Sequence, residues 1–256
     1  MQEKWETLEA LADDTESQIG GATRLKQFLG EAGHIAAWIK RKNVKNDLPE
    51  TINQTKTLIR RHDACEADMK AIQDRVDTLN GQTPKLITEH PDSEEQVEST
   101  IKAINAEWAE LKAKQAENRM LLGKLLEYQE FSQKAQNHLN WIQNLQNHLE
   151  KLEVAKELPL IEAQTLQHDE QFKIMQVKND DLKKIVESGD KLEDHKEDVA
   201  EKVLELNEKS EKLDNKWAEV KKELEEAIEL ARFERDCQRI EHWMEVRQTG
   251  MNLNNY

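Results

Sequence analysis

Few residues in this 256-residue chain could do chemistry, and the first to consider are His62 and Cys65. They lie one helical turn apart, a spacing at which two side chains of one helix can bind the same metal ion. No other ligand pair in matching register lies nearby in the sequence. The second cysteine, Cys237, belongs to a separate helical pattern, so neither a disulfide framework nor a zinc quartet is available. We therefore expect no metal site and two reduced, partly buried thiols.

Carboxylates are abundant, as in Glu223, Glu225 and Glu226. Acid–base catalysis, however, needs an enclosed pocket that shifts a carboxyl pKa, and a thin helical bundle supplies none. The sequence also lacks a Gly-rich phosphate loop, a calcium loop and a nucleophile motif. We expect no catalytic residue, no cofactor and no enzymatic activity.

The charge distribution restricts the class of partner. The formal net charge of −15 opposes binding to nucleic acid. A basic cluster of Lys40, Arg41, Lys42 and Lys45, together with the pair Arg60-Arg61, is a candidate contact for an anionic lipid surface or an acidic partner, although exposed helix faces explain these residues more simply. No apolar run approaches the roughly 20 residues that cross a bilayer, and the first residues lack the apolar core of a signal peptide. We expect a cytosolic chain with no membrane span.

The elements that position these residues are expected to be long helices. The chain is 37% apolar and 35% charged and contains only 8 Gly and 4 Pro, a mixture that favours helices with narrow apolar seams over strands. Apolar residues recur in steps of three and four, and the clearest stripe contains Val97, Ile101, Ile104, Trp108 and Leu111. The pattern from residue 93 to about residue 153 has no break, and its stripe shifts near Leu125. We interpret it as one helix that contributes to two cores in succession.

Turn signals separate these helices. Asp47-Leu48-Pro49-Glu50 predicts a helix start, with Asp47 as the N-cap and Pro49 in the first turn. His90-Pro91-Asp92-Ser93 predicts the end of one helix and the start of the next, and Asp194-His195-Lys196-Glu197 predicts a further start. Pro84 lacks a backbone donor and predicts a kink or break before His90. The pair Gly20-Gly21 predicts a weak point within a helix.

Landmark residues recur in a fixed order along the chain, which indicates a repeated unit of three helices. The first series is Trp38, Trp141 and Trp243, at intervals of 103 and 102 residues. In the second, His62-Asp63 recurs at His168-Asp169 and Met69 recurs at Met175, each 106 residues further on. The third series is Trp5, Trp108 and Trp217, at intervals of 103 and 109 residues.

A repeat of about 106 residues with a Trp-Ile or Trp-Met pair in its first helix, a His in its second and a Trp in its third resembles the spectrin family over the whole chain. The resemblance implies left-handed three-helix bundles in which each third helix continues into the first helix of the next repeat. We therefore expect an all-α fold of tandem three-helix repeats joined by continuous helices into an elongated rod. The expected boundaries are 1–21 for the end of a preceding third helix, 22–125 and 126–230 for two repeats, and 231–256 for the start of a following first helix.

The last junction is shorter than the two before it. From the third-helix Trp to the next first-helix Trp there are 33 residues at the earlier junctions but 26 from Trp217 to Trp243, so one heptad is missing. A shortened junction of this kind resembles the late part of a β-spectrin rod. The α-spectrin, plakin, dystrophin and nesprin rods share the same repeat.

The resemblance also implies a structural function. We expect a rod segment of a cytoplasmic protein at the cell cortex, a semi-flexible spacer that crosslinks or scaffolds the actin-based membrane skeleton, with actin bound only through domains outside this chain. The alternative is a docking module whose repeats bind an ankyrin-like adaptor, an anionic lipid or an opposing, antiparallel spectrin chain. The fragment itself is expected to be monomeric, because a two-stranded coiled coil would not interrupt its heptads at Asp47 and Asp92.

Overall fold

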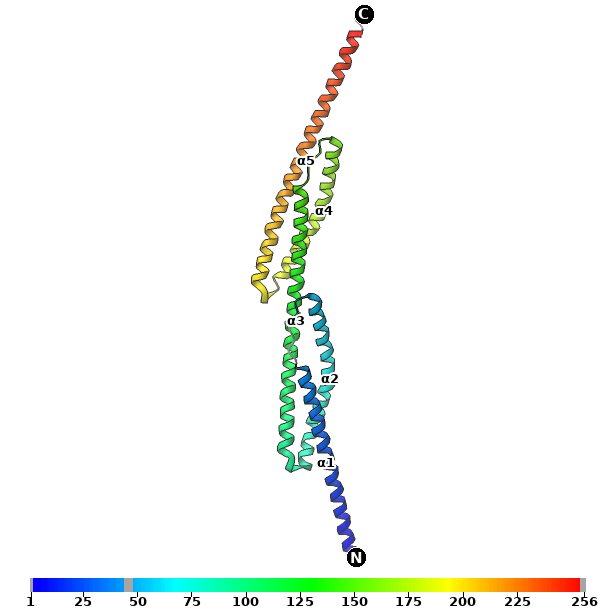
Figure 1. Cartoon of the computed structure of the whole chain (residues 1–256), viewed down its shortest axis with the longest axis vertical. Coiled ribbons are helices and arrows are strands. Elements are labelled where there is room, and N and C mark those ends of the chain that lie inside the picture. The colour runs from blue at the N-terminus through cyan, green and yellow to red at the C-terminus, as the bar shows by residue number, and fades with distance from the viewer. Residues whose placement is uncertain (1, 44–47, 254–256) are drawn as a thin grey trace. The chain divides into compact units, whose positions relative to one another are not determined.

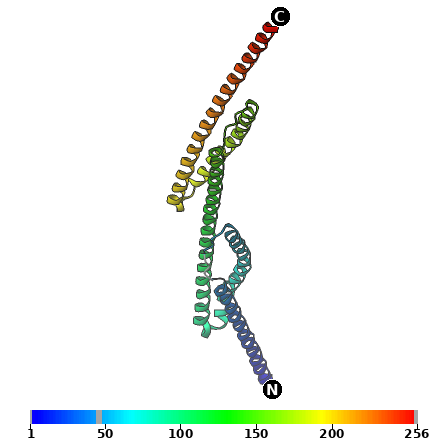
Figure 2. The same cartoon turned by 45° about the horizontal axis from the view of Figure 1, so that its top comes forward.

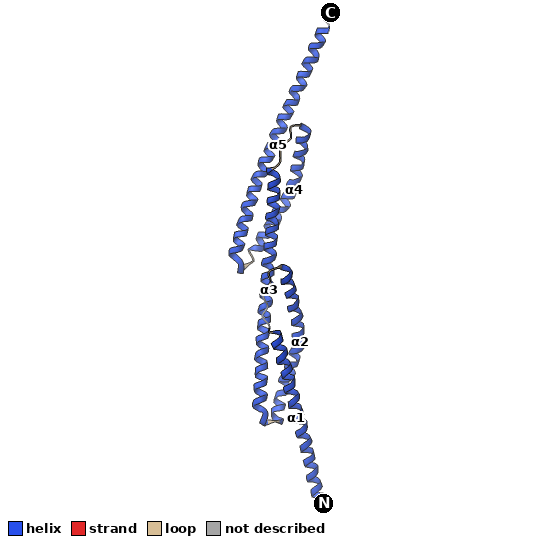
Figure 3. Cartoon of the chain, viewed as in Figure 1, coloured by secondary structure: helices blue, strands red, loops and turns tan. Residues whose placement is uncertain are grey.

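The described part of the chain is built from helices. The computed structural model describes residues 2–43 and 48–253. Its α-helices are α1 (Gln2–Lys42), α2 (Ile52–Glu89), α3 (Glu94–Glu150), α4 (Leu158–Gly189) and α5 (Lys196–Leu253), and short 3-10 turns at Pro91–Ser93 and Glu193–His195 precede α3 and α5. Within those two ranges no strand occurs (Figure 3). The predicted all-α class is confirmed.

The chain divides into two compact units, Met1–Leu126 and Glu127–Tyr256. The first part of α3 lies beside α1 and α2, and its second part lies beside α4 and α5 (Figure 1). The predicted long helix is confirmed, because α3 is a single helix of 57 residues that begins one residue later and ends three residues earlier than its pattern suggested. Each unit is therefore a three-helix unit, and α3 belongs to both.

The core of the first unit forms where apolar stripes of α1, α2 and α3 meet. Trp108 is 3% exposed within it, and the predicted α3 stripe is confirmed as the side that faces the core. Burial of each such side chain contributes about 1.5–3 kcal/mol. The buried apolar members of this core are Phe28, Ala32, Ile35, Ile39, Met69, Ile72, Val76, Leu79, Leu86, Val97, Ile104, Trp108 and Leu111.

The second unit buries its apolar side chains in two clusters. One surrounds Phe131 near the turn between α4 and α5, and the other surrounds Trp217 further along α5. His138 is buried on the same helix as Phe131, at 4% exposure. The first cluster contains Phe131, Ala135, Leu139, Leu182, Ile185, Leu192, Val199 and Leu206, and the second contains Ile142, Leu149, Ile161, Met175, Leu213, Trp217, Val220 and Leu224.

The start of α2 differs from the prediction. Thr51 is the N-cap, and its hydroxyl accepts a hydrogen bond from the backbone N–H of Gln54 at 3.3 Å. In return, Oε1 of the Gln54 side chain accepts one from the backbone N–H of Thr51 at 3.2 Å. Pro49 thus precedes the helix, and Asp47 lies outside the described residues. The prediction that Asp47 caps this helix is wrong. The reciprocal hydrogen bonds of Thr51 and Gln54 pair two backbone N–H groups that would otherwise lack a partner, and this favours a helix start at Thr51.

Pro84 lies inside α2 without ending it, so of the predicted kink or break the break is wrong. The helix continues to Glu89, and it is bowed along its length (Figure 2). Leu79 and Leu86 are 1% and 5% exposed on either side of the proline, and their burial offsets the roughly 3 kcal/mol that an interior proline costs. The Thr83 hydroxyl also donates to the Leu79 carbonyl at 2.9 Å, across the same turn.

The paired glycines Gly20 and Gly21 of α1 differ in their surroundings. The helix continues through both, and a Cβ atom at Gly20 would meet no other atom within 4 Å. Gly21 is buried, and a Cβ atom there would overlap the imidazole of His90, at the end of α2. Gly21 therefore allows close approach of α1 to the turn before α3, a role that its sequence pattern did not reveal.

Candidate functional site

The landmark residues of the first unit meet around Trp108. Its indole N–H donates to Oε1 of Gln73 at 2.6 Å, which ties α3 to α2. The ring centroid of Trp38 lies 6.1 Å away at a 51° tilt, which ties α3 to α1. The ammonium of Lys112 lies 5.8 Å from the Trp108 ring. One side chain thus connects all three helices, and an aromatic pair of this kind contributes about 0.5–1.5 kcal/mol beyond its burial.

The landmark residues of the second unit meet in a different arrangement. His168 stacks on Trp217 with ring centroids 3.8 Å apart and a 27° interplanar angle, and Phe172 lies 6.3 Å from the same indole. Burial lowers the pKa of His168, because the charged imidazolium would lose its water. His168 is buried, at 6% exposure. Nε2 of His168 has no hydrogen-bond partner among residues 2–43 and 48–253, but the ring also forms a hydrogen bond with the backbone of Trp217 on α5. Stacking and this cross-helix hydrogen bond together hold the ring.

His62 and Cys65 are both half-buried on α2. Burial, and secondarily the positive charge of Arg119, lowers the pKa of His62. The carboxylate of Asp63 forms an ion pair with Arg119 at 2.9 Å. Neither cysteine is in a disulfide, and within the described ranges no group of three or more His, Cys, Asp or Glu side chains could hold a metal ion.

His138 is a buried histidine to which the sequence analysis assigned no role. Its ring centroid lies 5.4 Å from that of Trp141, one turn along α3. Burial lowers the pKa of His138, and Nε2 has no hydrogen-bond partner in the described structure. The only sequence signal was its place on the apolar stripe, where a polar residue is unusual.

The basic cluster is partly explained by local structure. Lys40, Arg41 and Lys42 form the last turn of α1, where positive charges complement the helix dipole. Lys42 forms an ion pair with Asp68 at 3.1 Å and lies 5.5 Å from the Trp38 ring, whereas Lys40 and Arg41 are exposed. Arg60 and Arg61 are exposed on α2, and Lys45 is not among the described residues.

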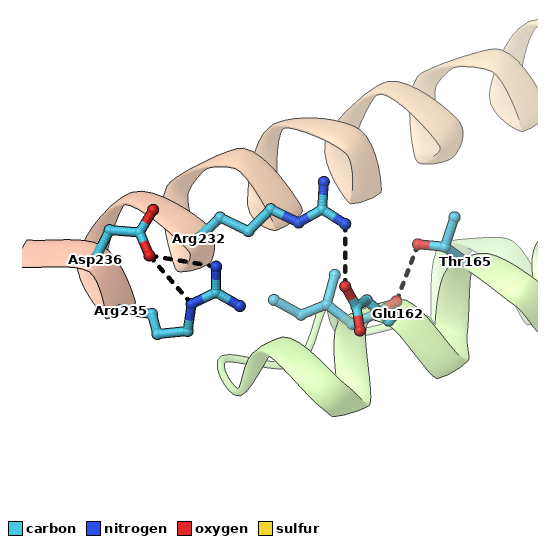
Figure 4. A network of polar contacts seen from close by, with 6 residues as sticks. Glu162, Thr165, Arg232, Arg235 and Asp236 are labelled. Atoms are coloured by element: carbon cyan, nitrogen blue, oxygen red, sulfur yellow. Dashed lines mark hydrogen bonds and ion pairs between the residues drawn. The ribbon is translucent and has the colours of Figure 1, made fainter. Parts of the chain in front are cut away.

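The second unit extends its contacts beyond the Trp217 cluster. Arg232 of α5 forms an ion pair with Glu162 of α4 at 3.1 Å (Figure 4). Nearby, Arg235 pairs with Asp236 at 3.3 Å, and the Thr165 hydroxyl donates to the backbone of α4. Of these contacts, Arg232–Glu162 joins α5 to α4, whereas the other two lie within one helix. Such an exposed pair contributes about 1 kcal/mol or less to stability.

Apolar stripes at the two outer helix segments are exposed in the described structure. Trp5 is 68% exposed on α1 and Trp243 is 58% exposed on α5, in contrast to Trp108 and Trp217. No helix of the described ranges is long and apolar enough to cross a membrane. The other exposed members are Leu8, Leu11 and Ile19 on α1 and Phe233, Ile240 and Met244 on α5.

Comparisons with known proteins agree with this geometry. A family model described as "Spectrin repeat" matches residues 23–124 and 126–226. The chain is 23% identical over 255 residues to "Spectrin alpha chain, erythrocytic 1" of Mus musculus, a match that covers 97% of this chain and 11% of the relative. It is 22% identical over 248 residues to "Spectrin beta chain, erythrocytic" of Mus musculus, covering 94% of this chain and 12% of the relative. The chain spans about a tenth of each relative, and the two identities do not favour an α-type or a β-type assignment.

Proposed function

We propose, from the premise that this chain belongs to the spectrin-repeat family, that it is a structural segment of a cytoskeletal rod. In this proposal it acts at the cell cortex as a semi-flexible spacer in the actin-based membrane skeleton, and other domains of a longer protein bind actin. Residues 22–125 and 126–230 are the two repeats, residues 1–21 end a preceding repeat, and residues 231–256 begin a following one.

The continuity of α3 is the observation that carries this proposal. A helix of 57 residues is about 85 Å long at 1.5 Å per residue, and both cores use it. A loop at the same place would swivel freely, whereas a helix resists bending because each bend disturbs its hydrogen bonds. The spacing between attachment points at the two ends is then set by helix length.

Resistance to stretching comes from the buried seams. Pulling on the chain ends must separate helices before it can extend them, so Trp108 and Trp217 must leave their cores. Each core is thin, so each unit opens at a modest cost and can refold. The expected behaviour is a spacer that lengthens stepwise under load.

Small-angle X-ray scattering of the whole chain tests the spacer proposal. We expect a radius of gyration at least twice the roughly 18 Å of a globular domain of this length. A matched control is a chain with a flexible Gly-Ser linker of eight residues inserted after Leu126, which should broaden the distance distribution. A radius of gyration near the globular value would contradict the proposal.

A second candidate function is docking, favoured by the exposure of Lys40 and Arg41 at the end of α1. We propose that these residues contact an anionic lipid surface, because juxtaposed basic residues near such a surface contribute about 1 kcal/mol each. The double variant Lys40→Glu with Arg41→Glu should lose cosedimentation with vesicles containing phosphatidylserine. The variant Lys222→Glu, which reverses an exposed charge in the second unit, is the control, and equal binding by all three chains would exclude this contact.

A further inference from the structure

We propose that acid opens the second unit at a polar layer in its core, formed by His138 of α3, Lys178 of α4 and Ser210 of α5. The buried apolar residues of the first unit form one cluster, whereas those of the second form two. The polar layer lies between these two clusters. The inference concerns a conformational switch within one unit and does not depend on the proposed spacer function.

Each member of the polar layer lies between the two clusters along its own helix. The apolar residue about one turn before it belongs to one cluster, and the apolar residue about one turn after it belongs to the other. These flanking pairs are Ala135 and Ile142 around His138, Met175 and Leu182 around Lys178, and Leu206 and Leu213 around Ser210. Residues three and four apart share a helix face, so the three polar residues lie on the sides that face the core. His138 and Ser210 are 4% and 8% exposed, and Lys178 is half-buried.

The first unit has apolar side chains in the places of His138 and Lys178. At the interval of 103 residues that relates Trp38 to Trp141, His138 corresponds to Ile35. At the interval of 106 residues that relates the second helices, Lys178 corresponds to Ile72. Ile35 and Ile72 are 0% and 5% exposed, and both belong to the single cluster of the first unit.

Ser210 takes the place of a tryptophan. The helix α5 begins 102 residues after α3, and its buried apolar residues repeat those of α3 at the same interval. By this interval Ser210 corresponds to Trp108, and Trp217 lies one heptad further along α5. A small hydroxyl side chain thus replaces the indole that joins three helices in the first unit. The residues that fix this interval are Val97, Ile104 and Leu111 on α3 and Val199, Leu206 and Leu213 on α5.

The surroundings of His138 disfavour its protonated form. Nε2 of His138 has no hydrogen-bond partner in the described ranges, and burial lowers the pKa of His138. On α4, the positive charge of Lys178 lowers this pKa further, and the negative charge of Asp181 opposes the shift. Asp181, however, already pairs with Lys178 and with Lys184, at 3.6 Å each. The folded unit therefore favours the neutral ring.

The charged groups of the other two helices near this level are paired or exposed. On α3, Lys134 is exposed one turn before His138. On α5 they are Lys209, which pairs with Glu205 at 2.7 Å, and the exposed Glu208, Glu211, Lys212 and Asp214. The stabilisation that accompanies the neutral His138 ring is complete above the unfolded pKa of about 6.5 and is lost as the pH falls towards the lower folded pKa. Because each cluster keeps its own apolar contacts, the loss affects the polar layer first.

Hydrogen exchange of the full chain, followed by mass spectrometry, tests where acid acts. Measured rates are divided by the intrinsic exchange rate at each pH, so that they report opening of the structure. Between pH 7.5 and pH 5.5 we expect opening of residues 176–181 to increase at least about threefold, and one histidine contributes at most about tenfold over this range. Residues 70–75, the equivalent segment of the first unit, should change by a smaller factor. No change at residues 176–181, or an equal change in both segments, would overturn the proposal.

Replacement of the histidine tests whether His138 controls the opening. His138→Ile copies Ile35 of the first unit and should reduce the pH dependence at residues 176–181 to less than about twofold. Lys222→Gln, which removes an exposed charge elsewhere on α5, is the control and should behave like the parent chain. A pH dependence that persists in the folded His138→Ile chain, or that disappears instead in a His168→Phe chain, would overturn the proposal.

A second variant tests the polar layer without changing the histidine. Lys178→Gln removes the neighbouring positive charge and should raise the pKa of His138, measured by NMR of its imidazole, towards the ordinary value of about 6.5. Lys222→Gln should leave this pKa unchanged. Circular dichroism checks the folding of each chain. If His138→Ile fails to fold, an unchanged His138 pKa in the folded Lys178→Gln chain overturns the proposal.

Discussion

At the scale of single residues, Trp108 and Trp217 belong to the same series of the repeat but contact different rings. Trp108 lies beside Trp38 of α1, and Trp217 stacks on His168 of α4. Both indoles are almost fully buried, so each contributes through removal of a large apolar surface from water. The neighbouring side chains differ, however. The Trp108 indole donates a hydrogen bond to Gln73, whereas the Trp217 indole stacks on the titratable ring of His168.

Truncation of Trp108 should destabilise the first unit strongly. We expect Trp108→Ala to reduce the free energy of unfolding by about 3–5 kcal/mol, because it leaves a cavity among three helices. The measurement is urea denaturation followed by circular dichroism. Trp5→Ala, at a residue that is 68% exposed, is the control and should change stability by less than about 0.5 kcal/mol. A loss below about 1 kcal/mol for Trp108→Ala would mean that this residue is not part of the core.

His168 should make the stability of the second unit depend on pH. Burial lowers its pKa in the folded state, so the unfolded state binds a proton more readily. The stabilisation that accompanies the neutral ring is complete above the unfolded pKa of about 6.5 and is lost as the pH falls towards the lower folded pKa.

Urea denaturation of the second unit at pH 7.5 and pH 5.5 measures this dependence. The His168→Phe chain should lose less stability between the two pH values than the parent chain. His34→Gln, at an exposed position, is the control and should behave like the parent. Identical pH dependence in the His168→Phe chain would show that this ring is not the titrating group.

At the scale of helices, α3 is the element that both units share. It runs from Glu94 to Glu150, while the division between the units falls between Leu126 and Glu127. Leu126 is half-buried and lies within an unbroken helix. The loss of helical structure on either side of this residue removes hydrogen bonds and packing on the other side as well, because helix formation is cooperative. The unfolding of the two units is therefore expected to be coupled.

Proline at the junction should remove this coupling. We expect the parent chain to unfold in one transition and the Leu126→Pro chain in two, because an interior proline removes a hydrogen bond and clashes with the preceding turn, at a cost of about 3 kcal/mol or more. Differential scanning calorimetry gives the number of transitions. Leu126→Ala is the control that removes the side chain and keeps the helix. Two transitions in the parent chain, unchanged by proline, would argue against a mechanical role for the shared helix.

At the scale of the whole molecule, the exposed apolar stripes of α1 and α5 are the features most able to cause association. Trp5, Phe233 and Trp243 are each more than half exposed. Against this, the net charge of −15 makes the chains repel one another.

We expect the chain to be a monomer in solution. Sedimentation velocity at tens of micromolar should give one species of about 30 kDa with a high frictional ratio. Raising the salt concentration screens the repulsion, so any dimer should appear first at high salt. A dimer at low salt would instead indicate that the exposed stripes pair strongly.

The helices and their order could be predicted from the amino-acid pattern alone. A periodicity of three and four residues is a property of a single helix, so it revealed α3 and its shift of stripe near Leu125 without knowledge of any neighbour. The same holds for the recurrence of Trp38 at Trp141 and of His62 at His168, which indicated the three-helix repeat.

The contacts between side chains of different helices could be read from the folded chain and not from the amino-acid pattern. The stack of His168 on Trp217 and the approach of Gly21 to His90 each depend on how far one helix is shifted along another. A heptad pattern is nearly unchanged by a shift of seven residues. It therefore predicts which face of a helix is buried, but it does not predict the axial register between that helix and the helix packed against it.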